Sequence, residues 1–83
     1  MSKSLFTKEY AAFLDLLKAA RRRSGLSQME VAQRLGETQS FVSKCERGER
    51  RLDVVEARAF CKAVGVSFVG LIAEFDREPG DEA

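Results

Sequence analysis

The stretch LSQMEVAQRLGETQSFVSKCERGERR, from Leu26 to Arg51, decides the fold, because it holds two short amphipathic patterns with almost nothing between them. Ser27 and Glu30 form a capping box that opens the first pattern, and Gly36 supplies the left-handed residue that ends it. Thr38 can cap the second pattern, which runs to about residue 47. A connector of only three residues therefore forces two helices to cross sharply.

Helix signals recur on both sides of this stretch. Before it, Thr7 can cap a helix that Gly25 ends, and after it Asp53 and Ser67 can cap two more. No alternating run of strand length appears. The sequence thus predicts an all-α fold with helices at about residues 7–24, 28–35, 39–47, 54–64 and 68–75. Residues 1–6 would be an N-terminal extension and residues 76–83 an acidic, disordered tail.

Composition points to one small globular domain. The chain has 83 residues, 45% of them apolar, with no run long enough to cross a bilayer and no signal-peptide core. We therefore expect a cytoplasmic protein. The chain has no histidine, and Cys45 and Cys61 are expected to be core residues. We expect no metal, no cofactor and no enzymatic activity, because neither a ligand set nor the usual acid–base catalyst is present.

The near-neutral net charge hides an asymmetry. Residues 1–51 hold 11 Lys and Arg against 6 Asp and Glu, whereas residues 52–83 hold 3 against 7. The basic part suggests a side that faces a polyanion, although helical proteins also scatter charge unevenly by chance.

The helix at 39–47 has an unusual outward side. At 100° per residue, Phe41, Val42 and Cys45 share one arc, which we expect to be buried. The opposite side presents amides, hydroxyls and cations: Gln39, Ser40, Ser43, Lys44 and Arg47. Such groups can hydrogen-bond the edges of base pairs. An ordinary solvated face is the alternative, but the tight connector favours a helix-turn-helix, whose second helix enters the DNA major groove.

The pattern L-S-Q-x-x-V-A-x-x-L-G-x-x-Q-S-x-V-S-x-x-E-x-G, from Leu26 to Gly48, resembles the Cro and phage-repressor (XRE-like) family of helix-turn-helix domains. The resemblance covers about residues 13–75, including V-G-V-S-F at 64–68. It implies a five-helix, lambda-repressor-like fold and double-stranded DNA as the partner. Glu37 departs from the family at a turn position that is often apolar.

The resemblance also implies roles for single residues. Gln39, Ser40 and Lys44 match base-reading positions, and Ser43 and Arg47 flank them. Four residues fall where phosphate contacts are expected: Gln28, Thr38, Arg50 and Arg51. Arg21 and Glu46 match a buried ion pair that joins the first and third helices. Arg22 and Arg23 either contact DNA or only complement the dipole of the first helix.

The fifth helix is apolar over too wide an arc for a simple surface helix. We expect Phe68, Leu71 and Ile72 to reach the core and Val69 and Phe75 to meet a partner. Because the family commonly dimerises through this region, the candidate dimer interface comprises Phe68, Val69, Ile72 and Phe75. Two reading helices would then lie about 34 Å apart on a palindromic operator.

These observations favour a sequence-specific transcriptional regulator, most simply a homodimeric repressor. Activation, control of a restriction–modification system and an antitoxin role stay open. The rival from another class is a protein–protein adaptor that keeps the fold without binding DNA. An adaptor should show acids or large apolar residues on the helix at 39–47, whereas this face carries amides, hydroxyls and cations.

Overall fold

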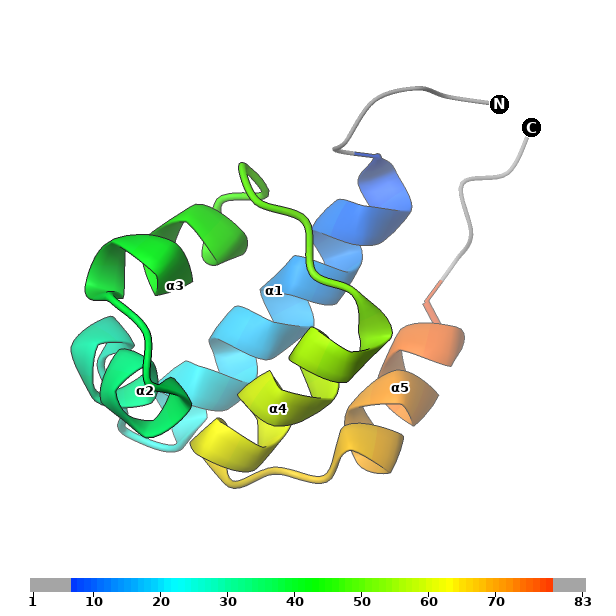
Figure 1. Cartoon of the computed structure of the whole chain (residues 1–83). Helices are drawn as coiled ribbons and strands as arrows, with labels where there is room; N and C mark the ends of the chain where they lie inside the picture. The colour runs from blue at the N-terminus through cyan, green and yellow to red at the C-terminus, as the bar shows by residue number, and fades with distance from the viewer. Residues whose placement is uncertain (1–6, 79–83) are drawn as a thin grey trace.

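The computed structural model describes residues 7–78, which form five α-helices and no strand (Figure 1). The helices are α1 (Lys8–Arg23), α2 (Gln28–Leu35), α3 (Gln39–Glu46), α4 (Val54–Val64) and α5 (Phe68–Asp76). The prediction of an all-α fold with five helices is confirmed. The predicted extension at 1–6 and residues 79–83 of the predicted tail lie outside the described residues.

Each helix begins after the residue that the sequence predicts as its cap. The side chains of the five caps accept a hydrogen bond from the backbone N–H three residues on; these caps are Thr7, Ser27, Thr38, Asp53 and Ser67. The α2 and α4 starts are complete capping boxes. Helix ends agree to within one residue. The clearest difference is that α3 ends at Glu46, with Arg47 as its cap rather than its last residue.

The turn between α2 and α3 depends on Gly36. Its φ of 72° lies in the left-handed region, where a side chain would be strained. This conformation lets the N–H groups of Gly36 and Glu37 reach the carbonyls of Gln33 and Ala32, at 3.3 and 2.9 Å. Carbonyls of the last turn of α2 are thus hydrogen-bonded by Gly36 and Glu37, and Thr38 follows directly as the cap of α3.

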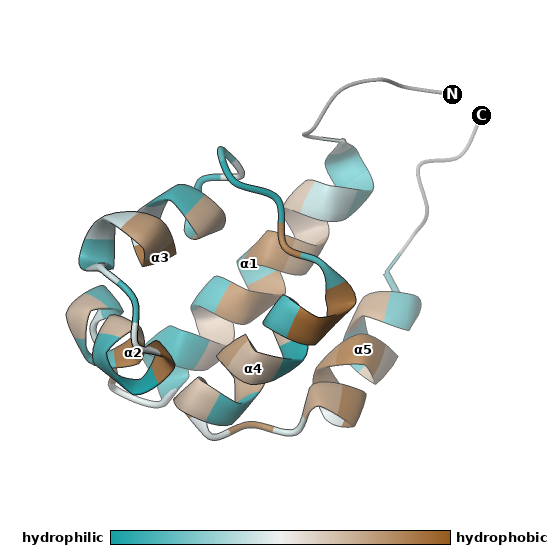
Figure 2. Ribbon diagram, in the orientation of Figure 1, coloured by the Kyte–Doolittle hydropathy of each residue, from teal (hydrophilic) through white to brown (hydrophobic). Residues whose placement is uncertain are grey.

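The core lies between α1 and the other helices. α1 packs against α3, α4 and α5, while α2 packs against α3 and α4. Figure 2 shows apolar residues on the inner sides of the helices. Val31, Val42 and both cysteines are completely buried, as expected for Cys45 and Cys61. Burial raises the pKa of both thiols.

Phe41 departs from the predicted arc. It is only half-buried, whereas Val42 and Cys45 are fully buried. The reason is its place at the edge of α3, where its ring packs against the core and also faces the guanidinium of Arg50 at 4.9 Å.

The packing of α5 agrees with the prediction at two of the three expected core positions. Leu71 is buried and Phe68 is half-buried against the core, whereas Ile72 is 38% exposed. Phe75, predicted to meet a partner, packs edge-on against Phe13 with ring centroids 5.5 Å apart. Val69 projects outward and is 78% exposed. Among residues 7–78, no helix combines the length and apolar character that a membrane span needs.

Candidate nucleic-acid interface

The outward side of α3 carries the side chains that the sequence assigns to base reading. Gln39, Ser40 and Lys44 are exposed, whereas Ser43 is half-buried. Arg47 is exposed but follows the helix as its cap. Behind this face, Val42 and Cys45 anchor the helix in the core. The structure therefore presents the polar side of α3 to solvent on a firmly packed helix.

A buried ion pair ties α3 to α1. The guanidinium of Arg21 donates from Nε to Oε2 of Glu46 at 2.6 Å and from Nη2 to Oε1 at 2.9 Å. Arg21 also donates to the carbonyl of Leu26 at 3.0 Å, just before α2. Burial opposes ionisation of Glu46, but the bonds from Arg21 and Gln28 outweigh it and hold the pKa of Glu46 below its usual value.

The side-chain amide of Gln28 links the ion pair to the outward side of α3. Gln28, the first residue of α2, donates from Nε2 to Oε1 of Glu46 at 3.0 Å. Its Oε1 accepts from Nε2 of Gln39 at 3.5 Å, the outer limit for a hydrogen bond. The predicted phosphate contact Gln28 and the predicted base contact Gln39 thus lie side by side at the starts of α2 and α3. Thr38 uses its hydroxyl to cap α3, where it accepts from Phe41 N at 3.0 Å.

Arg47 is held beside the outward face rather than extended over it. Its Nε donates to Oε2 of Glu49 at 2.8 Å, and its Nη1 donates to the hydroxyl of Ser43. Both Arg47 and Glu49 remain about half exposed in their side chains, at 53% and 55%. A base contact by Arg47 would have to compete with Glu49.

The next arginine in the chain, Arg50, binds side chains of the protein itself. It forms a two-pronged pair with Glu56 of α4, at 2.7 and 3.1 Å, and lies over the Phe41 ring. The same Glu56 closes the capping box of α4. The hydrogen bond with Arg50, together with the cap, lowers the pKa of Glu56. Arg50 thus braces the loop between α3 and α4, and its predicted phosphate contact would compete with Glu56.

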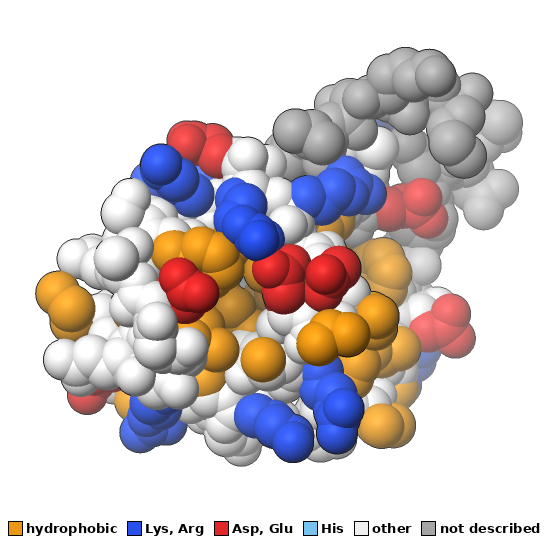
Figure 3. Space-filling view, viewed as in Figure 1, with side chains coloured by type: hydrophobic (Ala, Val, Ile, Leu, Met, Phe, Trp, Pro, Cys, Tyr) orange, Lys and Arg blue, Asp and Glu red, His pale blue; other side chains and the backbone are white. Residues whose placement is uncertain are grey.

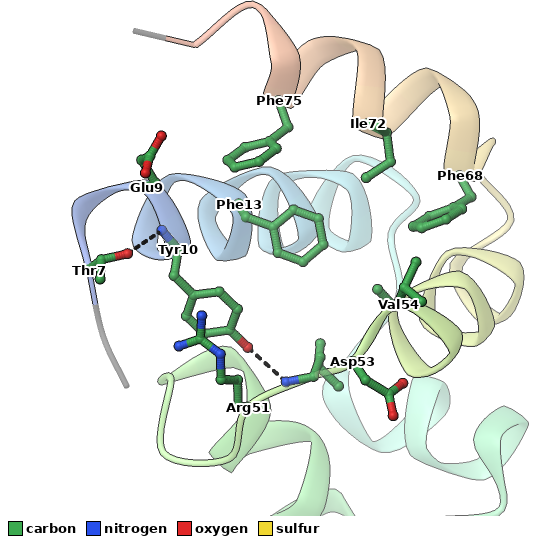
Figure 4. A pocket seen from close by; sticks show the side chains of 12 residues that line it. Thr7, Glu9, Tyr10, Phe13, Arg51, Asp53, Val54, Phe68, Ile72 and Phe75 are labelled. Carbon is green, nitrogen blue, oxygen red and sulfur yellow. Dashed lines mark hydrogen bonds between the residues drawn. The ribbon is translucent and has the colours of Figure 1, made fainter. Parts of the chain in front are cut away.

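Arg51 has a different neighbour. Its guanidinium lies over the ring of Tyr10 of α1, with Cζ 4.4 Å from the ring centroid (Figure 4). The Tyr10 hydroxyl accepts a hydrogen bond from the backbone N–H of Leu52 at 2.9 Å. Figure 3 shows basic side chains over the end of α3 and the loop that follows it, with acidic side chains beside them.

The structure therefore brings some predicted site residues together and separates others. The α3 face and Gln28 are contiguous, and α5 lies away from them across α1 and α4 (Figure 1). Sequence reasoning missed the partners Glu49, Glu56 and Tyr10. Glu49 follows Arg47 by two residues and Glu56 follows Arg50 by six across a loop, so helical spacing gave no signal. Tyr10 lies 41 positions from Arg51, and nothing local connects them.

Three comparisons with known proteins bear on this arrangement. A family model described as a helix-turn-helix domain matches residues 12–75. An uncharacterized HTH-type transcriptional regulator, y4dJ, of Sinorhizobium fredii is 41% identical over 59 residues, which cover 71% of this chain and 77% of that protein.

Solved structures give the same picture. An XRE-family like protein from Pseudomonas syringae pv. tomato superposes with a TM-score of 0.80 at 48% identity, covering 82% of this chain and 83% of that one. A point mutant of the restriction–modification controller protein C.Esp1396I has a TM-score of 0.77 at 21% identity, covering 86% and 90%. The clp gene regulator ClgR of C. glutamicum also has a TM-score of 0.77, at 19% identity, covering 93% and 100%. At these lower identities the last two likenesses concern the fold alone.

Proposed function

Because the chain belongs to the XRE-type helix-turn-helix family of transcriptional regulators, we propose that it binds a palindromic operator as a homodimer and represses transcription. The observation that carries the proposal is the outward side of α3. It is polar and cationic, it is exposed, and it sits on a helix fixed from behind by Val42, Cys45 and the Arg21–Glu46 pair. A helix of this kind fits the major groove.

Contacts with bases follow from the chemistry of the exposed groups. Gln39 presents an amide that matches adenine, and Lys44 presents an ammonium that matches the acceptors of guanine. Ser40 adds a hydroxyl that can donate or accept. Ser43 and Arg47 stand at the edge of this set, because each bonds the other and Arg47 also bonds Glu49.

Contacts with phosphates would position α3 over the base pairs. Gln28 and Thr38 stand at the starts of α2 and α3, where backbone N–H groups favour an anion. Arg51 would reach the backbone from the loop after α3. Arg50 is the weakest member of the predicted phosphate set, because it is already paired with Glu56.

Dimerisation would place a second α3 one helical turn of DNA away. The exposed apolar side chains of α5, Val69 and Ile72, are candidates for the contact. Phe68 and Phe75 would support them from the partly buried side of the helix. A dimer seated on its operator would repress by excluding polymerase from the same DNA.

Binding-site selection from random duplex DNA tests the proposal. We expect one palindrome to be enriched, and Lys44→Ala to relax preference at particular base pairs of it, at a cost of about 1–3 kcal/mol per lost contact. Lys62→Ala is the matched control, because Lys62 is an exposed lysine on α4; it should leave affinity and preference unchanged. Recovery of no sequence above the starting pool would contradict the proposal and favour the adaptor alternative.

A further inference from the structure

A buried carboxylate lies directly behind the proposed reading face. Glu46 is only 5% exposed, and its Oε1 accepts from Nη2 of Arg21 at 2.9 Å and from Nε2 of Gln28 at 3.0 Å. Burial raises the pKa of Glu46, but these bonds outweigh it and hold that pKa below its usual value, so the group is ionised at neutral pH. An ionised carboxylate can only accept hydrogen bonds. Glu46 therefore requires Gln28 to turn its amide nitrogen inward.

The orientation of the Gln28 amide in turn decides the orientation of the Gln39 amide. Because Nε2 of Gln28 is bound to Glu46, its Oε1 faces Gln39 and accepts from Nε2 of that residue at 3.5 Å. The reverse orientation of the Gln39 amide would bring two acceptor oxygens together with no hydrogen between them. One N–H of Gln39 thus points toward Gln28, while its Oε1 and second N–H are left for the outward side of α3.

This polarity distinguishes the two purines. Along the major-groove edge, adenine presents the acceptor N7 and a donor, the N6 amino group, whereas guanine presents two acceptors, N7 and O6. An amide that offers one oxygen and one N–H matches adenine. An amide whose oxygen is turned inward would offer two N–H groups, which match the acceptors of guanine.

We propose that Glu46, acting through Gln28, is a positioning residue that sets the polarity of the Gln39 amide and so makes Gln39 select adenine over guanine. This inference rests on the proposed function and gives the buried ion pair a role in base preference beyond its role in stability. Gln39 makes the base contact, and Glu46 acts from behind α3 without touching the DNA.

Substitutions of Gln28 test the inference, because they change the group that faces Gln39 and leave Glu46 in place. Gln39→Ala first identifies, within the operator selected by the parent, the base pair whose preference depends on Gln39. The measured quantity is the ratio of the dissociation constants for operators that carry guanine or adenine at that base pair. The parent should bind the adenine operator at least about fivefold more tightly, the lower end of what a bidentate contact contributes to discrimination.

Two variants of Gln28 should lower this ratio by different amounts. Gln28→Met has a similar length and no strong donor or acceptor, so Gln39 can turn either way and the guanine operator should gain affinity relative to the adenine operator. Gln28→Lys presents an ammonium, which can only donate, to both Glu46 and Gln39. The oxygen of Gln39 should then turn inward, and the ratio should fall below that of Gln28→Met.

The two roles proposed for Gln28 can be separated. A changed phosphate contact affects both operators alike and cancels in the ratio. In the Gln39→Ala background, neither substitution of Gln28 should alter the ratio. Gln33→Met and Gln33→Lys are the matched controls, because Gln33 is an exposed glutamine of the same helix, and both should keep the parental ratio. Melting curves establish that every variant is folded at the titration temperature.

Three results would overturn the inference: a parental ratio in both Gln28 variants, a change in the ratio that persists in the Gln39→Ala background, or a Gln39→Ala variant with parental preference at every base pair. Each of them leaves the proposed function standing, because the parent still selects one operator. A parent that enriches no duplex would instead overturn the proposed function, and this inference with it. The two failures are therefore distinguishable.

Discussion

α3 and α5 are helices of nearly equal length whose attachments differ. α3 is held by two fully buried apolar residues and by a buried polar chain that runs from Arg21 through Glu46 to Gln28. α5 is held by one buried residue, Leu71, and by partly buried aromatic rings, while Val69 faces outward. The difference shows that the proposed reading helix is oriented by directional bonds, whereas the contacts described between α5 and the rest of residues 7–78 are apolar.

The largest expected effect is on the attachment of α3. Glu46→Ala leaves Arg21 buried with no carboxylate, so we expect a loss of about 3–5 kcal/mol in the free energy of unfolding. Urea denaturation followed by circular dichroism measures it. Glu46→Gln is the control, since it preserves shape and one acceptor and should cost less. A normal melting temperature for Glu46→Ala would contradict the structural role of the pair.

A single apolar substitution should weaken the attachment of α5. Leu71→Ala removes its one buried anchor and should cost about 2–4 kcal/mol, because it leaves a cavity beside the core. Hydrogen exchange should show α5 losing protection before α3. Equal loss of protection in both helices would mean that α5 and α3 do not open separately.

Lowering the pH should weaken the attachment of α3 before it weakens the packing of α5. The folded-state pKa of Glu46 is depressed below its ordinary value of 4.5, so its contribution is fully present above that pH and is lost as pH falls through the folded pKa. Unfolding free energies between pH 7 and pH 3 should therefore decline less steeply for Glu46→Gln than for the parent. Parallel declines would show that Glu46 is not responsible. Glu30 and Glu56, whose pKa values are also lowered, contribute a slope common to both proteins.

The smallest effect on stability should come from the outward side of α5. Val69→Glu changes an exposed side chain and should alter the unfolding free energy by less than about 0.5 kcal/mol. It should nevertheless weaken self-association in sedimentation equilibrium, and operator affinity with it. Val55→Glu, at a valine of α4 that is 71% exposed, is the matched control and should leave the association constant unchanged. A monomeric parent would contradict the proposed interface.

The helices were predictable because their signals are local. Caps such as Ser27 and Asp53, and stops such as Gly36, act within four residues, and the spacing of Val42 and Cys45 marked the buried side of α3. The partners of the arginines were not predictable in this way. Glu56 pairs with Arg50 across a loop, and Tyr10 contacts Arg51 from a position 41 residues earlier in the chain. Such contacts depend on how the helices pack, which spacing along one helix does not encode.

The two buried thiols can report the local opening of α3 and α4. Cys45 belongs to α3 and Cys61 to α4, both are completely buried, and burial suppresses their ionisation. The thiolate is the reacting species. A thiol-reactive reagent can therefore modify either cysteine only when the surrounding structure opens and exposes the thiol to water. Labelling rates resolved by mass spectrometry would give the opening equilibrium of each helix in plain buffer, without denaturant and without an engineered probe.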